Sequence, residues 1–156
     1  MQASGVRKRG LDRACLVATY VVLLAIGLLS GVIESFLVPL RLTHGIEGLS
    51  AVLAVVGNLV VGWFGGVGTR TLTGAILPTL GWFVAVGALL LFAPGGDVVF
   101  VGKLPADPGI VVVGNAFLLL GVFGGAIALI LTFRSIRIAA ARTGYTEPGY
   151  APTPQT

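Results

Sequence analysis

Glu34 is the residue of this chain best placed to do chemistry, because it lies inside the apolar run "LLSGVIESFLVPLR" of residues 28–41. A carboxylate inside a bilayer is costly and marks a functional site by default. Asn115, in the last apolar segment, has a similar expected depth and is a candidate partner, and Arg41 and His44 are further candidates at the outer rim. Two hypotheses follow. Glu34 is either an interfacial or hydrogen-bonded structural carboxylate, or a protonatable site that couples proton release to substrate binding.

The other polar residues form no recognisable catalytic or metal-binding set. The chain has one cysteine, Cys15, and one histidine, His44, which excludes a CxxC site and a histidine cluster. Asp97 and Asp107 are not spaced as in a calcium loop. The glycine-rich "GGVGTRT" of residues 65–71 lacks the GK[ST] of a phosphate-binding loop. We therefore expect no enzyme activity, no metal and no cofactor.

The composition is that of a membrane protein. Of the 156 residues, 56% are hydrophobic and only 10% are charged, whereas a soluble domain carries roughly 25% charged residues. The net charge of +4 comes from basic residues beside the apolar segments, where they set orientation. The sequence thus predicts the lipid bilayer as a partner and excludes nucleic acid.

Four apolar segments are long enough to cross a bilayer, which takes about 20 residues. They cover approximately residues 14–40, 48–64, 72–92 and 110–133, and they predict an all-α bundle of four transmembrane helices. A basic N-terminus is expected at 1–13, and a basic, then disordered proline-rich tail at 134–156. The third connection has "VVFV" between glycine and proline clusters, which predicts a short extended or hairpin-like outer loop.

The basic residues also predict how the helices are oriented. Eight of the ten Lys and Arg residues lie in the two terminal flanks and the second connection, and only Arg41 and Lys103 lie elsewhere. Cytoplasmic flanks carry an excess of Lys and Arg. Both termini are therefore expected in the cytoplasm, with the helices crossing a bacterial plasma (inner) membrane.

Each apolar segment carries a stripe of small or polar residues at helical spacing. The first stripe is Gly27, Ser30, Gly31 and Glu34, and the third is Gly74, Pro78, Gly81, Ala85 and Ala88. Such stripes let membrane helices approach closely, so four of them favour a compact bundle. They leave open whether each one meets a helix of the same chain or a partner, and Gly121/Gly125 is a candidate lipid-facing, partner-binding pair. Asn58 is expected to bond to another helix, and Trp63 and Trp82 are expected to be packing or interfacial residues. The expected packing residues are Gly27, Gly31, Asn58, Gly62, Gly81, Gly121 and Gly125.

The second half of the chain carries a resemblance, in "TRTLTGAILPTLGWFVAV", "GGDVVF" and "NAFLLLGVFGG". Residues 69–125 resemble an uncharacterised group of small actinobacterial four-helix integral membrane proteins. The resemblance implies an actinobacterial plasma membrane and no active-site residues. The chain is also similar to small multidrug-resistance transporters, which have four helices and a glutamate in the first. It departs from them because Glu34 lies further toward the outer end and the third connection is longer.

The dense packing stripes and the missing catalytic set favour one function. We expect an accessory or scaffolding subunit of a plasma-membrane assembly, whose partner is another membrane protein or a second copy. The alternative is a small proton-coupled transporter that acts as a homo-oligomer with Glu34 as its coupling carboxylate.

Overall fold

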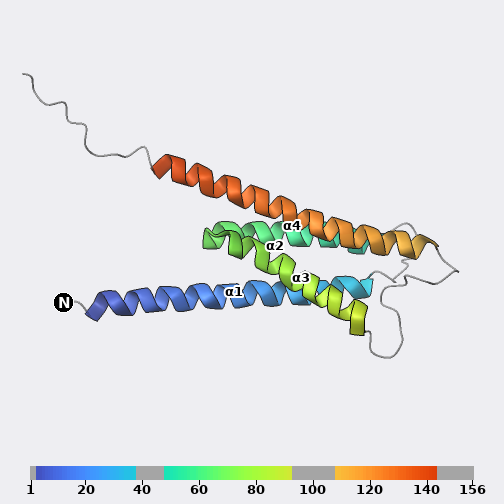
Figure 1. Ribbon diagram of the computed structural model, residues 1–156, viewed down its shortest axis with the longest axis horizontal. Coiled ribbons are helices and arrows are strands. Elements are labelled where there is room, and N and C mark those ends of the chain that lie inside the picture. The colour runs from blue at the N-terminus through green and yellow to red at the C-terminus, as the bar shows by residue number, and fades with distance from the viewer. Residues whose placement is uncertain (1–2, 38–47, 93–107, 144–156) are drawn as a thin grey trace, which may run out of the picture.

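The computed structural model describes residues 3–37, 48–92 and 108–143, and these residues form four helices (Figure 1). They are α1 (Ala3–Leu37), α2 (Leu49–Thr69), α3 (Leu72–Phe92) and α4 (Pro108–Thr143). Each is apolar over a stretch long enough to span a membrane, and in α1 and α4 these stretches are Asp12–Leu37 and Gly114–Ala141. The prediction of an all-helical chain with four candidate spans is therefore confirmed for the described residues.

The helix ends differ most from the prediction where the chain is basic. The bounds of α3 agree with it, but α1 begins at Ala3 instead of residue 14, and α4 continues to Thr143 instead of ending at residue 133. Arg and Lys are good helix formers, and their long side chains reach water from a helix that leaves the membrane. Hydropathy marked only the apolar part of each helix. The predicted outer loop (residues 93–107) and the proline-rich end of the tail lie outside the described residues.

A tight turn joins α2 to α3 and is built from hydroxyl groups. Arg70 ends α2 in the left-handed conformation (φ 54°), a usual way to finish a helix. The Thr71 hydroxyl accepts a hydrogen bond from the Gly74 backbone N–H (3.1 Å) and so caps the start of α3. The same hydroxyl lies 2.8 Å from the Tyr20 hydroxyl of α1. The turn therefore also fixes α1 against the other two helices.

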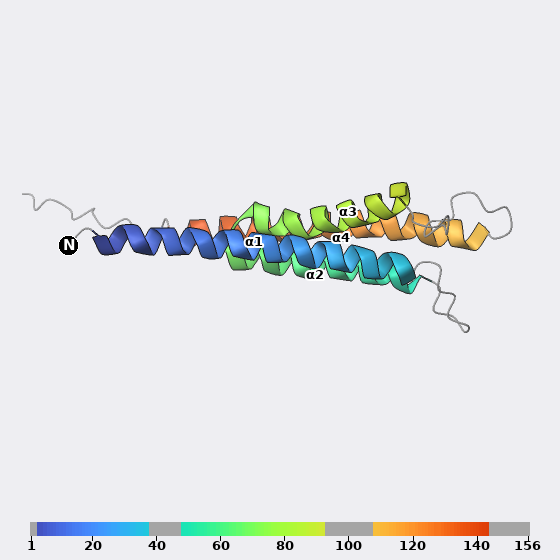
Figure 2. The same cartoon turned by 90° about the horizontal axis from the view of Figure 1, so that it is seen from below.

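Helices that are not consecutive in the chain make the most extensive contacts. α1 packs mainly on α3, and α2 packs mainly on α4. Within the described ranges, α1 and α4 do not touch each other. Figures 1 and 2 show α3 crossing α1 at an angle, with α2 between α1 and α4. α1 and α4 both extend beyond α2 and α3 at the end that carries the α2–α3 turn (Figure 1).

The predicted stripes line these contacts. Gly27 of α1 lies directly against the Pro78 backbone of α3, and Gly65 of α2 faces Gly74 of α3. On the other side of α2, an added Cβ at Gly62 would lie 2.9 Å from the Ala128 Cβ of α4. Helices this close gain from dispersion contacts along their whole length. These glycines therefore lie where helices of the same chain meet.

Two details of the stripes were wrong. Ala88, the last member of the α3 stripe, is exposed. Gly121 and Gly125 are buried against Trp82 and Thr79 of α3, so the pair packs on a helix of the same chain instead of on a partner. The physical reason is that α4 needs a small-residue face toward α3, and this pair supplies it.

Candidate functional site

Glu34 is buried, with only 5% of its surface exposed, and both of its carboxylate oxygens accept a hydrogen bond. The Ser30 hydroxyl donates to Oε1 over 2.6 Å, from one turn earlier in α1. The Trp82 indole N–H of α3 donates to Oε2 over 2.7 Å. Such short bonds are typical of bonds to a carboxylate. Both donors are neutral groups. Glu34 is therefore held by two hydrogen bonds to neutral side chains instead of by an ion pair with a Lys or Arg.

Three helices position this carboxylate, and α3 does so through the Trp82 donor. α1 carries it on the same face as Gly27 and Gly31, where the i, i+3, i+4, i+7 spacing places it. α2 contributes Gly57, at which an added Cβ would lie 3.1 Å from Glu34 Oε1. The missing side chain there lets the α2 backbone approach the carboxylate.

Packing holds the Trp82 donor in place. Trp82 is fully buried, and its ring centroid lies 5.1 Å from that of Phe117 on α4. The far edge of the indole rests against Gly121, where a Cβ would overlap it. The indole therefore bridges α1 and α4 through the centre of the bundle, and the helix pairing fixes where its N–H points.

The Glu34 carboxylate lies beside turns in the interior of α2 and α3 instead of beside the ends of these helices. Trp82 is at the middle of α3 (Leu72–Phe92), and Gly57 is eight residues, about 12 Å, inside the start of α2. Of the two forms of the structural hypothesis, interfacial or hydrogen-bonded, the contacts support the hydrogen-bonded one. The sequence placed Glu34 nearer a helix end because it measured depth along α1 alone.

The structure does not bring Asn115 to Glu34. Asn115 is exposed on α4, and the two oxygens of Glu34 accept from Ser30 and Trp82. Asn58 is buried, but its amide nitrogen has no hydrogen-bond partner among the described residues. That nitrogen therefore does not make the predicted bond to another helix. The alternative partners Arg41 and His44 lie outside the described residues.

Sequence reasoning missed the role of three residues at this site. Ser30 was placed on the stripe but not identified as a donor, although its i, i+4 spacing to Glu34 was a usable signal. Gly57 was missed because it lies off the main stripe of α2. Trp82 was interpreted as a packing or interfacial residue, and nothing local links it to Glu34, which is 48 residues away.

No family model matches the chain, and searches of curated proteins and of solved structures found no match to it. Fold and site together define a class: a multi-pass helical membrane protein with one buried, hydrogen-bonded carboxylate among the described residues. Its function has to be argued from that geometry.

Proposed function

We propose that the chain is an accessory or scaffolding subunit of a larger assembly in a bacterial plasma membrane, with both termini in the cytoplasm. The observation that carries the proposal is that the protein's own donors occupy both Glu34 oxygens inside a tightly packed contact of three helices. Such a carboxylate joins helices, and with 5% of its surface exposed it is enclosed by the chain's own side chains instead of being open to a substrate. The eight-to-two distribution of Lys and Arg supports the orientation.

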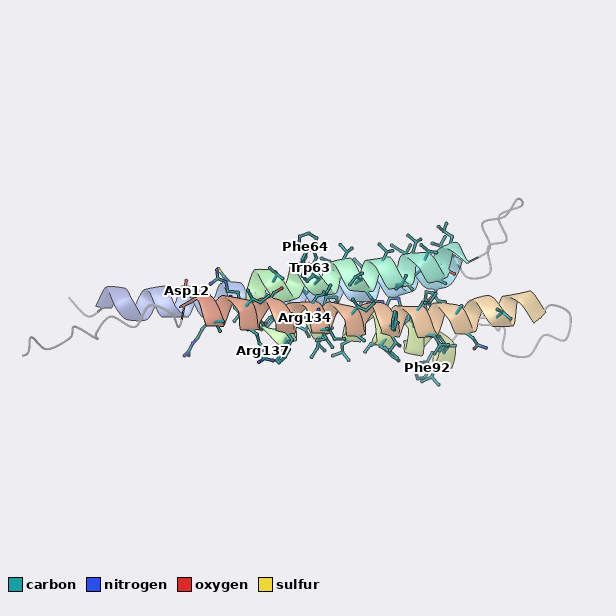
Figure 3. The ribbon with its side chains drawn as sticks, turned by 90° about the horizontal axis from the view of Figure 1, so that it is seen from above. Asp12, Trp63, Phe64, Phe92, Arg134 and Arg137 are labelled. Carbon is teal, nitrogen blue, oxygen red and sulfur yellow. The ribbon has the colours of Figure 1, made fainter. Side chains whose placement is uncertain are left out.

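The outer surface offers ample area for a partner. Large apolar side chains face away from the bundle, and Figure 3 shows Phe64 on α2 and Phe92 at the end of α3 pointing outward. Gly87 of α3 and Gly68 of α2 have nothing within 4 Å of an added Cβ. These two glycines play no part in packing within the described chain, so they mark places where another helix can come close.

The first experiment is extraction in native lipid particles, followed by mass spectrometry of what co-purifies. We expect a second membrane protein at constant stoichiometry. Gly87→Leu and Gly68→Leu serve as paired variants, because neither added side chain meets an atom of its own chain. Loss of the partner from only one of them would locate the interface. A chain that purifies alone would contradict the proposal.

The burial of Glu34 supports a second candidate, a proton-coupled transporter acting as a homo-oligomer. Glu34→Gln separates the two functions. A glutamine can accept from Trp82 Nε1 with its oxygen and donate to the Ser30 hydroxyl, which serves as donor or acceptor. We therefore expect an unchanged fold and an unchanged partner for an accessory subunit. A transporter would lose proton-coupled flux in vesicles, because the amide cannot carry the proton.

A further inference from the structure

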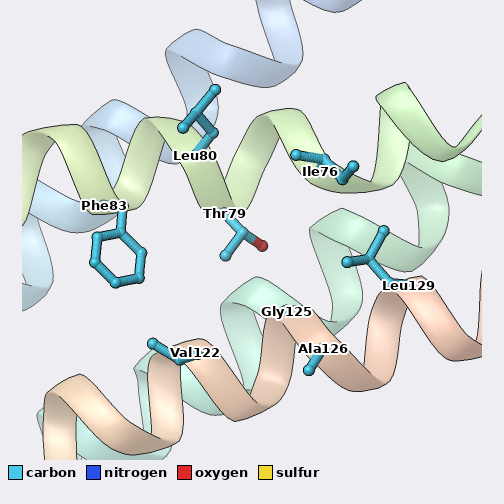
Figure 4. Close-up of a pocket in the computed structure, with 8 residues that line it drawn as sticks. All are labelled: Ile76, Thr79, Leu80, Phe83, Val122, Gly125, Ala126 and Leu129. Carbon is cyan, nitrogen blue, oxygen red and sulfur yellow. The ribbon is translucent and has the colours of Figure 1, made fainter.

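An apolar groove of about 280 Å³ opens between α3 and α4 on the outside of the bundle (Figure 4). Two of its lining residues are small, Gly125 and Ala126 of α4. Larger side chains line it as well, with Leu80 and Phe83 on α3 and Val122 and Leu129 on α4. α3 and α4 make the least extensive contact of the helix pairs that touch. The groove is the space that this limited contact leaves open toward the membrane.

The size of the groove selects its occupant. It runs along α4 from Val122 to Leu129, which is about 11 Å of helix. A volume of 280 Å³ over that length gives a mean cross-section of about 25 Å². An α-helix is 10–12 Å across with its side chains and places only a row of side chains in a groove this narrow. A single hydrocarbon chain fits, with its carbon atoms about 3.5–4.0 Å from the walls.

Arginines lie at one end of this groove. Thr79 of α3 meets Gly125 of α4. The two helices run in opposite directions, so Arg70, nine residues before Thr79, lies at about the same level as Arg134, nine residues after Gly125. Arg137 continues the α4 face that carries Ala126 and Leu129, at helical spacing. Its guanidinium lies over the Phe133 ring, 5.6 Å from the centroid. Figure 3 shows Arg137 projecting from α4 on the side where α3 lies.

The charge at this end is not balanced by nearby carboxylates. α3 has no acidic residue in its first turn. The acidic side chains of the described part are Asp12, exposed on α1, and Glu34, buried in the bundle. Asp12 lies eight residues, about 12 Å, beyond Tyr20, the α1 residue that meets the α2–α3 turn. The level of Arg70 and Arg134 therefore carries a net positive charge.

The distance from groove to charge is that of one lipid. From Val122, at the far end of the groove, to Arg137 is fifteen residues, or about 22 Å along α4. One leaflet of a bilayer, with its headgroup region, is half of about 40–45 Å. We propose that the α3–α4 groove binds one acyl chain of an anionic phospholipid, whose phosphate is held by Arg137, while Arg134 and Arg70 add positive charge at the same level. This inference does not depend on the proposed function.

The test is native mass spectrometry of the purified, delipidated full chain, titrated with phosphatidylglycerol or with phosphatidylcholine of the same acyl chains. We expect one phosphatidylglycerol bound per chain, in preference to phosphatidylcholine. Arg134→Gln/Arg137→Gln should reduce that preference by about fivefold for each arginine, the attraction of one cation to an anionic membrane surface. Arg13→Gln, which removes an exposed arginine of α1, is the matched control and should leave binding unchanged.

A second pair of variants tests the groove itself. Ala126→Trp places a large side chain in the groove from an exposed lining position and should abolish binding of both lipids. Ala88→Trp places the same side chain on an exposed site of α3 outside the groove and should not affect binding. A lipid with a photoreactive acyl chain should cross-link to residues 76–83 and 122–129 of the unaltered chain.

Three results would overturn the proposal. One is equal binding of the two lipids by the unaltered chain, and another is cross-links confined to other helices. The third is a dimer that Ala126→Trp dissociates, because a second copy would then occupy the groove. Since the cross-linking uses the unaltered chain, a variant that fails to fold does not leave the proposal untested.

Discussion

Replacing Gly27 by alanine should weaken the contact between α1 and α3, whereas the same replacement at Gly87 should not. At Gly27 the new Cβ would overlap the backbone carbonyl of Pro78, which cannot swing aside as a flexible side chain can. At Gly87 nothing lies within 4 Å of the new Cβ. Both changes lie inside membrane helices, so the helix-propensity gain of about 1 kcal/mol for Gly→Ala is common to both and cancels.

The magnitude follows from the backbone overlap. Overpacking a well-packed interior costs typically about 1–3 kcal/mol, and a clash with backbone belongs at the upper end of that range. Separating α1 from α3 also lengthens the hydrogen bond from Trp82 to Glu34, which is worth about 1 kcal/mol. We therefore expect Gly27→Ala to lower the free energy of unfolding by about 3 kcal/mol relative to Gly87→Ala.

The assay is titration of the protein in mixed micelles with sodium dodecyl sulfate, followed by tryptophan fluorescence. Both variants are made in a Trp63→Phe background, so that only the buried Trp82 reports on the packing of α1, α3 and α4. Far-UV circular dichroism checks that the helices persist in the folded state. If the two variants unfold within about 0.5 kcal/mol of each other, the spread of neutral substitutions, the α1–α3 contact is not held at Gly27 and the reasoning fails.

The same titration tests three further changes. Trp82→Phe removes the donor to Glu34 Oε2 and empties space beside Gly121, and should lower the free energy of unfolding by about 3 kcal/mol. Unfolding of this variant is followed by far-UV circular dichroism, and an unchanged free energy of unfolding would mean that the bond is not formed. Tyr20→Phe removes the hydroxyl next to Thr71 and should cost about 1 kcal/mol, with an unchanged midpoint counting against the inter-helix bond. Thr132→Val should raise the free energy of unfolding by about 1 kcal/mol, because the buried Thr132 hydroxyl has no partner within the described part of the chain; a loss would show that this hydroxyl is bonded.

The sequence predicted the inward face of α1 well. In α1 the spacing of Gly27, Gly31 and Glu34 placed the carboxylate toward protein, and all three are buried. The prediction succeeded because a helix has a fixed 100° step per residue, so spacing alone determines which residues share a face. Helix ends were less predictable, because the basic extensions of α1 and α4 are helical without being apolar.

The partners of Glu34 could be predicted only in part. Ser30 lies one turn away in the same helix, a relation that the sequence contains. Trp82 reaches Glu34 only because α3 crosses α1 at that turn. Asn115 was expected at a similar depth, yet it is exposed. The prediction failed because depth along a helix carries no information about the direction in which a side chain points relative to other helices.

The sequence by itself determined that the chain suits a membrane, that it has four helices, and which small residues share a face of each helix. These follow from composition, length and period, which are properties of one segment at a time. The tertiary structure decided that α1 lies on α3 and α2 on α4, that Gly121 and Gly125 face α3, and that a groove is left between α3 and α4. All four stripes use the same small residues, so any pairing would satisfy the pattern. Only the fit of particular contacts in three dimensions, such as Gly27 on Pro78 and Trp82 on Gly121, selects one pairing.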